Sequence, residues 1–354
     1  MKPKLVIAGA TGFIGRWFID RYKHKYQIIA LSRRKAIPDT TDPQVTWRQV
    51  ELYSLSQTTA ALRDADFALY LVHSMQPTTR LSQGTFDDTD VLLADNFARA
   101  AEANQLDQIV FLGGILPEEG TTYSRHLRSR YEVEQTLSSG PVPLTALRAG
   151  IIVGPGGSSF RIMEKLVRRL PAMICPSWTK SVSAPIGLED MLQMIDYCLG
   201  RPEMYDRVFD VGGSQSMTYI DMMKAVADLL NKRRWITAVP FFSPGLSKLW
   251  VATFADSSRT LVSPLVESLR YDLPVKGNDL MEQFPVRESF IESARHALHR
   301  KDSVPPLPSF EVQNSPPNER NTVRSVQRLP NPNDRTATWV ARRYQTWLPR
   351  FFAI

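Results

Sequence analysis

The stretch Lys4-Leu5-Val6-Ile7-Ala8-Gly9-Ala10-Thr11-Gly12-Phe13-Ile14-Gly15 decides the fold of this chain. An apolar run leads into a turn with glycines at three-residue spacing, and apolar residues at helical spacing follow the turn. In such a turn free backbone N–H groups face an anion at the start of a helix, and side chains would block its approach. The layout therefore predicts a pyrophosphate site, with contacts from Gly9, Thr11, Gly12, Phe13, Ile14 and Gly15.

Strand-like and helix-like segments alternate through the first half of the chain. The strand-like segments are near-continuous apolar runs, which are typical of a parallel sheet covered by helices on both faces. We therefore expect an α/β fold, a Rossmann-type doubly wound parallel sheet followed by a smaller mixed C-terminal substrate lobe. The predicted strands cover residues 4–8, 27–31, 45–50, 67–72, 108–112 and 143–148, and helices are predicted over residues 55–64, 90–104 and 123–138.

Changes in composition suggest four parts. The regular alternation ends at the glycines of residues 154–157, so the predicted nucleotide-binding domain covers residues 1–157. Residues 158–300 are expected to form the smaller lobe, interleaved with the sheet. Five prolines lie within residues 303–320, which predicts a linker over residues 301–322. Residues 323–354 form a basic segment with one predicted helix.

Composition excludes several classes of protein. The formal net charge is +7, and residues 300–354 alone carry nine Lys or Arg against four Asp or Glu. A basic tail suits an anionic partner or surface, but solvation explains it as well. Basic and aromatic residues are not interleaved in the way that nucleic-acid readout needs, and no metal-ligand spacing occurs around Cys175 and Cys198. Without a membrane-length apolar run or a signal peptide, we expect a cytoplasmic location.

The end of the second predicted strand bears on the choice of nucleotide. A site that prefers NAD places an acid there for the ribose hydroxyls, whereas this chain has Ser32, Arg33 and Arg34. A hydroxyl and two guanidiniums suit the 2′-phosphate of NADP, because Arg binds phosphate through a planar fork. The sequence therefore favours NADP(H) over NAD(H), with a solvated surface Arg pair as the alternative.

Three further motifs carry a family resemblance. They are residues 70–75 (YLVHSM), 126–130 (HLRSR) and 147–154 (LRAGIIVG). Together with the glycine turn, they resemble atypical and extended short-chain dehydrogenase/reductases, the NAD(P)H-binding, nucleoside-diphosphate-sugar-epimerase-like proteins. The resemblance covers about residues 1–300. Residues 323–329 resemble the start of a further domain that this subgroup carries.

The resemblance implies a catalytic site in which this chain departs from the family pattern. Active members use a Ser after the fifth strand and a Tyr-x-x-x-Lys on the next helix. Here the Ser position holds Gly113 or Gly114, the Tyr position holds His126 and the Lys position holds Arg130. In one interpretation His126 is the general acid or base, Arg130 lowers its pKa and binds ribose or phosphate, and Tyr123 is an alternative proton donor. In the other, the site binds NADP(H) without catalysing a reaction.

Two other regions remain open. Val72 ends a predicted strand, and His73 and Gly113 follow predicted strands. We expect cofactor contacts from all three at the mouth of the cleft; His73 can equally be a strand-end cap. Residues 239–269 are strongly apolar but interrupted by charges, so they suit a membrane surface, a hydrophobic pocket or the core of the lobe.

The resulting functional hypothesis is an NADP(H)-binding oxidoreductase or epimerase-like enzyme on a bulky small molecule. The alternative is a non-catalytic NADP(H)-sensing or assembly protein. We predict no metal and no nucleic-acid partner; peripheral membrane contact through residues 239–269 or the basic tail is a further hypothesis, and the oligomeric state is undetermined.

Overall fold

The computed structural model describes residues 2–37, 41–73, 86–117, 124–239, 270–300 and 303–311. The chain divides into two compact units, Met1–Glu311 and Val312–Ile354, and every described residue belongs to the first. The predicted helix of the basic tail and residues 240–269 therefore lie outside the described residues. In the described part of the chain, no helix combines the length and the apolar character that a membrane crossing requires.

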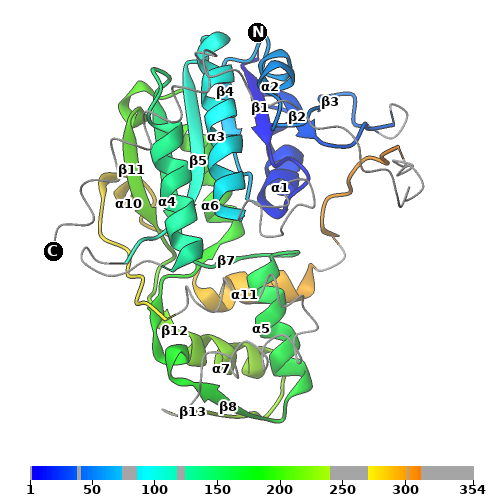
Figure 1. Ribbon diagram of the computed structural model, residues 1–354. Helices are drawn as coiled ribbons and strands as arrows, with labels where there is room; N and C mark the ends of the chain where they lie inside the picture. Colours follow the sequence, from blue (N-terminus) through cyan, green and yellow to red (C-terminus); the bar gives the residue numbers. More distant parts are fainter. Residues whose placement is uncertain are drawn as a thin grey trace, which may run out of the picture. The chain divides into compact units, whose positions relative to one another are not determined.

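A seven-stranded parallel sheet forms the centre of the first unit (Figure 1). The strand order reverses between β1 and β4, and this reversal defines a doubly wound sheet. The predicted fold class is thus confirmed. In spatial order the strands are β11 (Arg207–Val211), β6 (Leu144–Ala149), β5 (Gln108–Gly114), β4 (Phe67–Tyr70), β1 (Lys4–Ala8), β2 (Gln27–Ser32) and β3 (Val45–Gln49).

Helices bury both faces of the sheet. One face packs against α1 (Phe13–Tyr22) and α6 (Leu188–Cys198), and the other packs against α2 (Leu55–Ala61), α3 (Phe86–Ala103) and α4 (Arg125–Leu137). Alternate residues of β1 point to opposite cores, and Leu5, Val6, Ile7 and Ala8 all have no exposed surface. This two-sided burial explains why the strands are apolar without alternation.

The chain leaves the sheet after β6 and later returns to it. It passes through the short strand β7 (Ile152–Val153) into the smaller lobe, comes back through α6 and adds β11 beside β6. The pattern of residues 208–211 predicts a strand, and β11 lies at the edge of the sheet. Phe209 and Val211 are buried there, whereas Val208 is 49% exposed.

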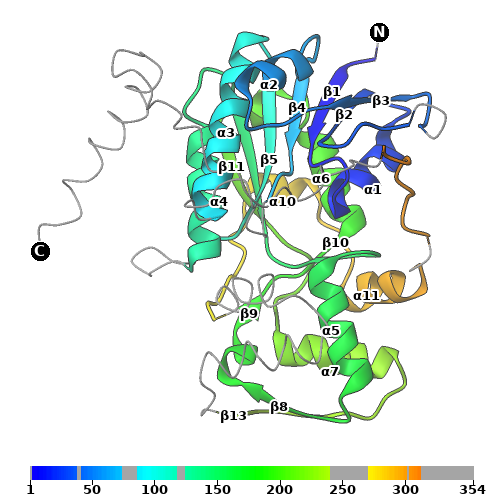
Figure 2. The ribbon, with the colours of Figure 1, turned by 45° about the vertical axis from the view of Figure 1, so that its right-hand side comes forward.

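The smaller lobe has its own core (Figure 2). Buried residues of α5 (Ser158–Arg169), α7 (Tyr219–Leu229) and α11 (Phe290–His299) form one cluster. A complete capping box at Ser289 and Glu292 fixes the start of α11. The remaining elements are β8 (Ala172–Pro176), η2 (Ser177–Lys180), β9 (Val182–Ser183), β10 (Ile186–Gly187), η3 (Pro202–Met204), β12 (Met217–Thr218), β13 (Trp235–Val239) and α10 (Asp279–Gln283).

Candidate functional site

The glycine turn lies where the strand order reverses, between the ends of β1 and β4. Gly9 has φ +88°, and a Cβ there would lie 2.9 Å from the carbonyl carbon of Leu71, which follows β4. The Gly12 N–H donates to the Gly9 carbonyl oxygen at 2.9 Å. A Cβ on Gly15 would lie 2.5 Å from the same oxygen. Gly9 and Gly15 are thus required because a side chain at either position would collide with the backbone of the turn or of Leu71.

Gly12 differs from the other two glycines. It is exposed and is the N-cap of α1, and this cap residue supplies no side-chain hydrogen bond to the first turn of the helix. The backbone N–H groups at the N-terminus of α1 are therefore suited to an anionic group. Thr11 and Phe13 are half-buried beside them, whereas Ile14 is buried in the core.

The predicted 2′-phosphate residues follow β2. The Ser32 side chain is buried, and its Oγ accepts the Arg34 N–H at 3.1 Å. Arg33 and Arg34 are exposed, and the Arg34 guanidinium lies over the Phe310 ring, 4.3 Å from the ring centroid. The Ser32 hydroxyl therefore shapes the turn that presents the two guanidiniums.

Residues 303–311, which we call the return segment, run past this position (Figure 2). Ile37 N–H donates to the Ser309 carbonyl at 2.8 Å, and Glu311 N–H donates to the Lys35 carbonyl at 2.9 Å. Arg16 on α1 donates from Nε to the Pro305 carbonyl at 2.8 Å. These residues belong to the stretch predicted as a linker, and they border both α1 and the end of β2.

A chain of three titratable side chains lies at the carboxyl ends of β4 and β5. His73 follows β4, Asp90 lies on α3, and His126 lies in the first turn of α4. His73 Nδ1 is 3.2 Å from Asp90 Oδ2, and His73 Nε2 is 2.9 Å from His126 Nε2. The Ser124 side chain caps α4 by accepting a hydrogen bond from the Leu127 N–H. This cap fixes where the helix begins and therefore where His126 lies.

Burial has the largest effect on the pKa values of the two histidines. It lowers the pKa of His73, although the hydrogen bond to Asp90 opposes the shift. Burial, followed by the charges of His73 and Arg130, lowers the pKa of His126 to about 3. Asp90 is 1% exposed. At neutral pH His126 is therefore a neutral imidazole.

Arg130 lies one turn after His126, and its side chain is buried. One guanidinium nitrogen donates to the Val72 carbonyl at 2.9 Å and another to the Leu112 carbonyl at 2.5 Å. The guanidinium also lies over the Phe111 ring, 4.7 Å from its centroid. In this arrangement Arg130 joins the ends of β4 and β5 and places a positive charge beside both histidines.

The remaining predicted residues have different locations. Gly113 is the sixth residue of β5, and the Val72 carbonyl is one of the two acceptors of Arg130. Tyr123, the alternative proton donor, lies outside the described residues. At the positions that the resemblance equates with the family's Tyr, Lys and Ser, the chain has His126, Arg130 and a glycine.

Sequence reasoning missed Asp90 as a neighbour of the candidate site residue His73. Its signal was a carboxylate beside the apolar stripe of a predicted helix, where a buried charge needs a partner. It also missed Phe310, because an aromatic residue in a proline-rich stretch does not reveal what it packs against.

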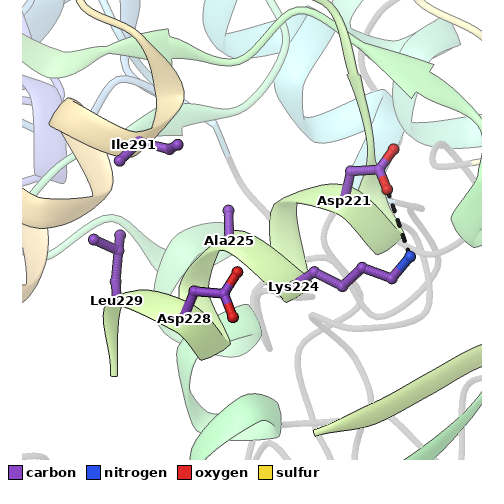
Figure 3. Close-up of a pocket in the computed structure, with 6 residues that line it drawn as sticks. All are labelled: Asp221, Lys224, Ala225, Asp228, Leu229 and Ile291. Atoms are coloured by element: carbon purple, nitrogen blue, oxygen red, sulfur yellow. Dashed lines mark ion pairs between the residues drawn. The ribbon is translucent and has the colours of Figure 1, made fainter. Parts of the chain in front are cut away.

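Among the described residues, no group of three or more His, Cys, Asp or Glu side chains is arranged to hold a metal ion. A hollow of about 430 Å³ lies on α7 in the smaller lobe, and Figure 3 shows Asp221 and Lys224 paired at its edge, 3.8 Å apart. Its other lining residues are Ala225, Asp228, Leu229 and Ile291, so it is separate from the glycine turn and the histidines.

The sheet topology and the glycine turn define a Rossmann-type α/β protein. Residues 5–173 match the model of the NAD dependent epimerase/dehydratase family. The resemblance to nucleoside-diphosphate-sugar-epimerase-like proteins is thereby confirmed.

Individual relatives are more distant. The chain is 30% identical over 114 residues to the auxiliary protein GraX of Staphylococcus aureus, a match that covers 32% of this chain and only 37% of GraX. It is 20% identical over 296 residues to UDP-glucose 4-epimerase of Vibrio cholerae, covering 77% and 88% of the two chains. The fold is similar to that of Citrobacter sp. triphenylmethane reductase complexed with NADP(H), with a TM-score of 0.64, 14% identity, and coverage of 83% and 99%.

Proposed function

We propose that this chain binds NADP(H) and acts as an oxidoreductase or epimerase-like enzyme on a bulky small molecule. The observation that carries the proposal is the exposed, uncapped start of α1 at Gly12, located where the strand order reverses. A Cβ at Gly12 would lie 3.1 Å from the Gly9 carbonyl oxygen and would intrude on the approach to these N–H groups. The residues present therefore fit a pyrophosphate.

The proposed nucleotide is NADP(H), and Arg33 and Arg34 are its 2′-phosphate ligands. Both side chains are exposed beside the end of β2, where the adenosine ribose lies in doubly wound folds. Guanidiniums form charge-assisted hydrogen bonds with phosphate. The remaining predicted contacts, Val72, His73 and Gly113, would border the nicotinamide half.

His126 is the proposed proton carrier for the substrate, with the substrate pocket at the carboxyl edge of the sheet. Bound NADP(H) would supply hydride transfer. The chain's own contribution is to orient the substrate and to give or take a proton at the reacting oxygen. Arg130 supports this role from a distance, because its guanidinium is already bonded to the Val72 and Leu112 carbonyls.

A second candidate is a protein that binds NADP(H) and signals or assembles without turnover. Two observations favour it: Ser, Tyr and Lys are all replaced at the positions that the family uses, and a relative with 30% identity over 114 residues is described as an auxiliary protein. In this case nucleotide binding would change the affinity for a partner.

One set of measurements tests the nucleotide site and separates the two candidates. We expect calorimetry to detect NADPH binding that is stronger than NADH binding, and Gly12→Glu to abolish both. Gly140→Glu is the matched control, because Gly140 is exposed and a Cβ there would meet nothing within 4 Å. Unchanged NADPH affinity in Gly12→Glu would contradict the site.

Turnover is then assayed as loss of NADPH absorbance with a panel of carbonyl compounds and quinones. Turnover that disappears in His126→Gln supports the enzyme. Tight NADPH binding without turnover on any compound supports the non-catalytic candidate.

A further inference from the structure

We propose that Asp90, His73 and His126 form a proton relay, in which His126 exchanges a proton with the substrate and passes it to His73, while Asp90 positions and stabilises His73. The relay deepens the proposed function and rests on it for the substrate. Its resting arrangement is a property of the protein alone and can be tested without substrate.

The contacts determine where the protons lie. Asp90 Oδ2 faces His73 Nδ1 at 3.2 Å, and because a carboxylate only accepts, Nδ1 of His73 carries a proton. Two ring nitrogens 2.9 Å apart hold one proton between them, since the contact needs one donor and one acceptor. In the neutral pair His73 Nε2 is therefore the acceptor and His126 Nε2–H is the donor.

In this arrangement His126 Nδ1 carries no proton and is the proton-accepting nitrogen of the ring. When Nδ1 takes a proton from a substrate hydroxyl, the Nε2 proton of His126 moves to His73 Nε2. One proton enters the pair at Nδ1, and the positive charge ends on His73 beside the Asp90 carboxylate. In the reverse direction His73 returns its proton to His126 Nε2, and Nδ1 delivers one to the substrate oxygen.

The relay accounts for a difficulty with His126 as a lone acid or base. A buried imidazole with a pKa of about 3 is not protonated near neutral pH and has no proton to give from a charged state. In the relay His126 changes tautomer but stays neutral, and His73 holds the charge. His73 is the better place for it because the hydrogen bond to Asp90 favours its charged form.

Groups on several elements act on the pair. Asp90 from α3 favours the charged form, and Arg130 from α4 disfavours it. Tyr70 of β4 is fully buried, and its hydroxyl, whose pKa burial raises, stays neutral. Arg130 also fixes the spacing of the rings, because it joins the end of β5 to Val72, the neighbour of His73.

The tautomers can be read directly from long-range ¹H–¹⁵N NMR spectra of the nucleotide-free full-length protein. The chain has only five histidines, and the spectra of His73→Gln and His126→Gln assign the two signals. We expect a protonated Nδ1 on His73 and a protonated Nε2 on His126. A proton on His73 Nε2 in the neutral pair would overturn the relay.

The Asp90 carboxylate is tested by Asp90→Asn, with Asp95→Asn as the matched control on the same helix. Asp95 pairs with Arg99 at 3.8 Å, one turn along α3. Loss of the Asp90 charge should lower the protonation midpoint of the histidine pair by about 1 to 3 pH units and shift the pH profile of turnover to lower pH by the same amount. Asp95→Asn should move neither. An unchanged midpoint in folded Asp90→Asn would contradict the proposal.

The two proposals fail in different ways. The expected tautomers in a protein without turnover overturn the enzymatic function and leave only the resting arrangement of Asp90, His73 and His126 in place. Different tautomers in a protein that turns over NADPH overturn the relay alone.

Discussion

Burial of His126 has a consequence for the pH dependence of folding. In the folded chain its pKa is lowered to about 3, whereas an exposed histidine of the unfolded chain titrates near about 6.5. Between these values the unfolded chain binds more protons, so the free energy of unfolding falls as the pH falls. The stabilisation is complete above about pH 6.5 and is lost toward pH 3.

We therefore predict that His126→Gln reduces this loss. Between pH 6.5 and 5 a single such histidine contributes a decrease of at most about 2 kcal/mol, from about 1.4 kcal/mol per pH unit. Urea denaturation at several pH values measures the slope, and His24→Gln, which changes an exposed histidine after α1, is the control. Equal slopes in the unmodified protein and His126→Gln would contradict the burial of a neutral imidazole.

At the residue scale, the sequence predicts the role of a residue when that role depends on its near neighbours along the chain. The spacing of Gly9, Gly12 and Gly15 predicts the turn, because the crowding that excludes side chains is local. Asp90 and His73 lie 17 positions apart, and only the packing of α3 against the sheet brings them together. Such contacts have no periodic signal, so the sequence did not reveal this pair.

At the scale of elements, the contact between α4 and β6 depends on one buried ion pair. Arg148 on β6 donates from Nε and Nη2 to the two carboxylate oxygens of Glu134 on α4, at 2.9 and 2.6 Å. The Glu134 side chain is 4% exposed and the Arg148 side chain 18%. Removing one partner of a buried pair leaves the other charge without compensation.

We predict that Glu134→Gln lowers the free energy of unfolding by about 3 kcal/mol. Glu132→Gln on the same helix is the matched control, since Glu132 pairs with Arg128 at 3.0 Å on the exposed surface. Exposed pairs contribute less than about 1 kcal/mol. Urea denaturation at neutral pH compares the two variants, and equal losses would show that the pair does not stabilise the α4–β6 contact.

The elements themselves were largely predictable. All six strands of the first half were predicted. Five of them are apolar runs with both faces buried, whereas in the edge strand β3 only Val45 is buried. Helix starts were less accurate: α3 begins at Phe86 rather than residue 90, and α4 begins at Arg125 because Ser124 caps it. The position of β11 beside β6 was not predictable, because its pattern specifies a strand but not its neighbour.

At the scale of the whole described unit, the return segment joins distant parts of the sequence. Phe310 contacts the Trp47 ring edge-on, with centroids 5.7 Å apart, and supports the Arg34 guanidinium. Lys35 and Glu311 add an ion pair at 2.7 Å. The backbone bonds to residues 35–37 hold this arrangement in register.

We predict that Phe310→Ala lowers the free energy of unfolding by about 1 to 2 kcal/mol, from the loss of one aromatic contact and one cation–π contact. Thermal unfolding measures the effect as a lower melting temperature. Val286→Ala, at a side chain that is 89% exposed, should leave the melting temperature unchanged. An unchanged melting temperature in Phe310→Ala would show that the return segment does not stabilise the unit.

The return segment also has a consequence for the order of events during synthesis. Arg16 and its acceptor Pro305 are separated by 289 residues. At translation rates of about 5 to 20 residues per second, the ribosome needs roughly 15 to 60 s to make the second after the first. The amino-terminal half therefore emerges with the outer side of α1 and the Trp47 edge still uncovered. During this interval the return segment cannot cover these surfaces.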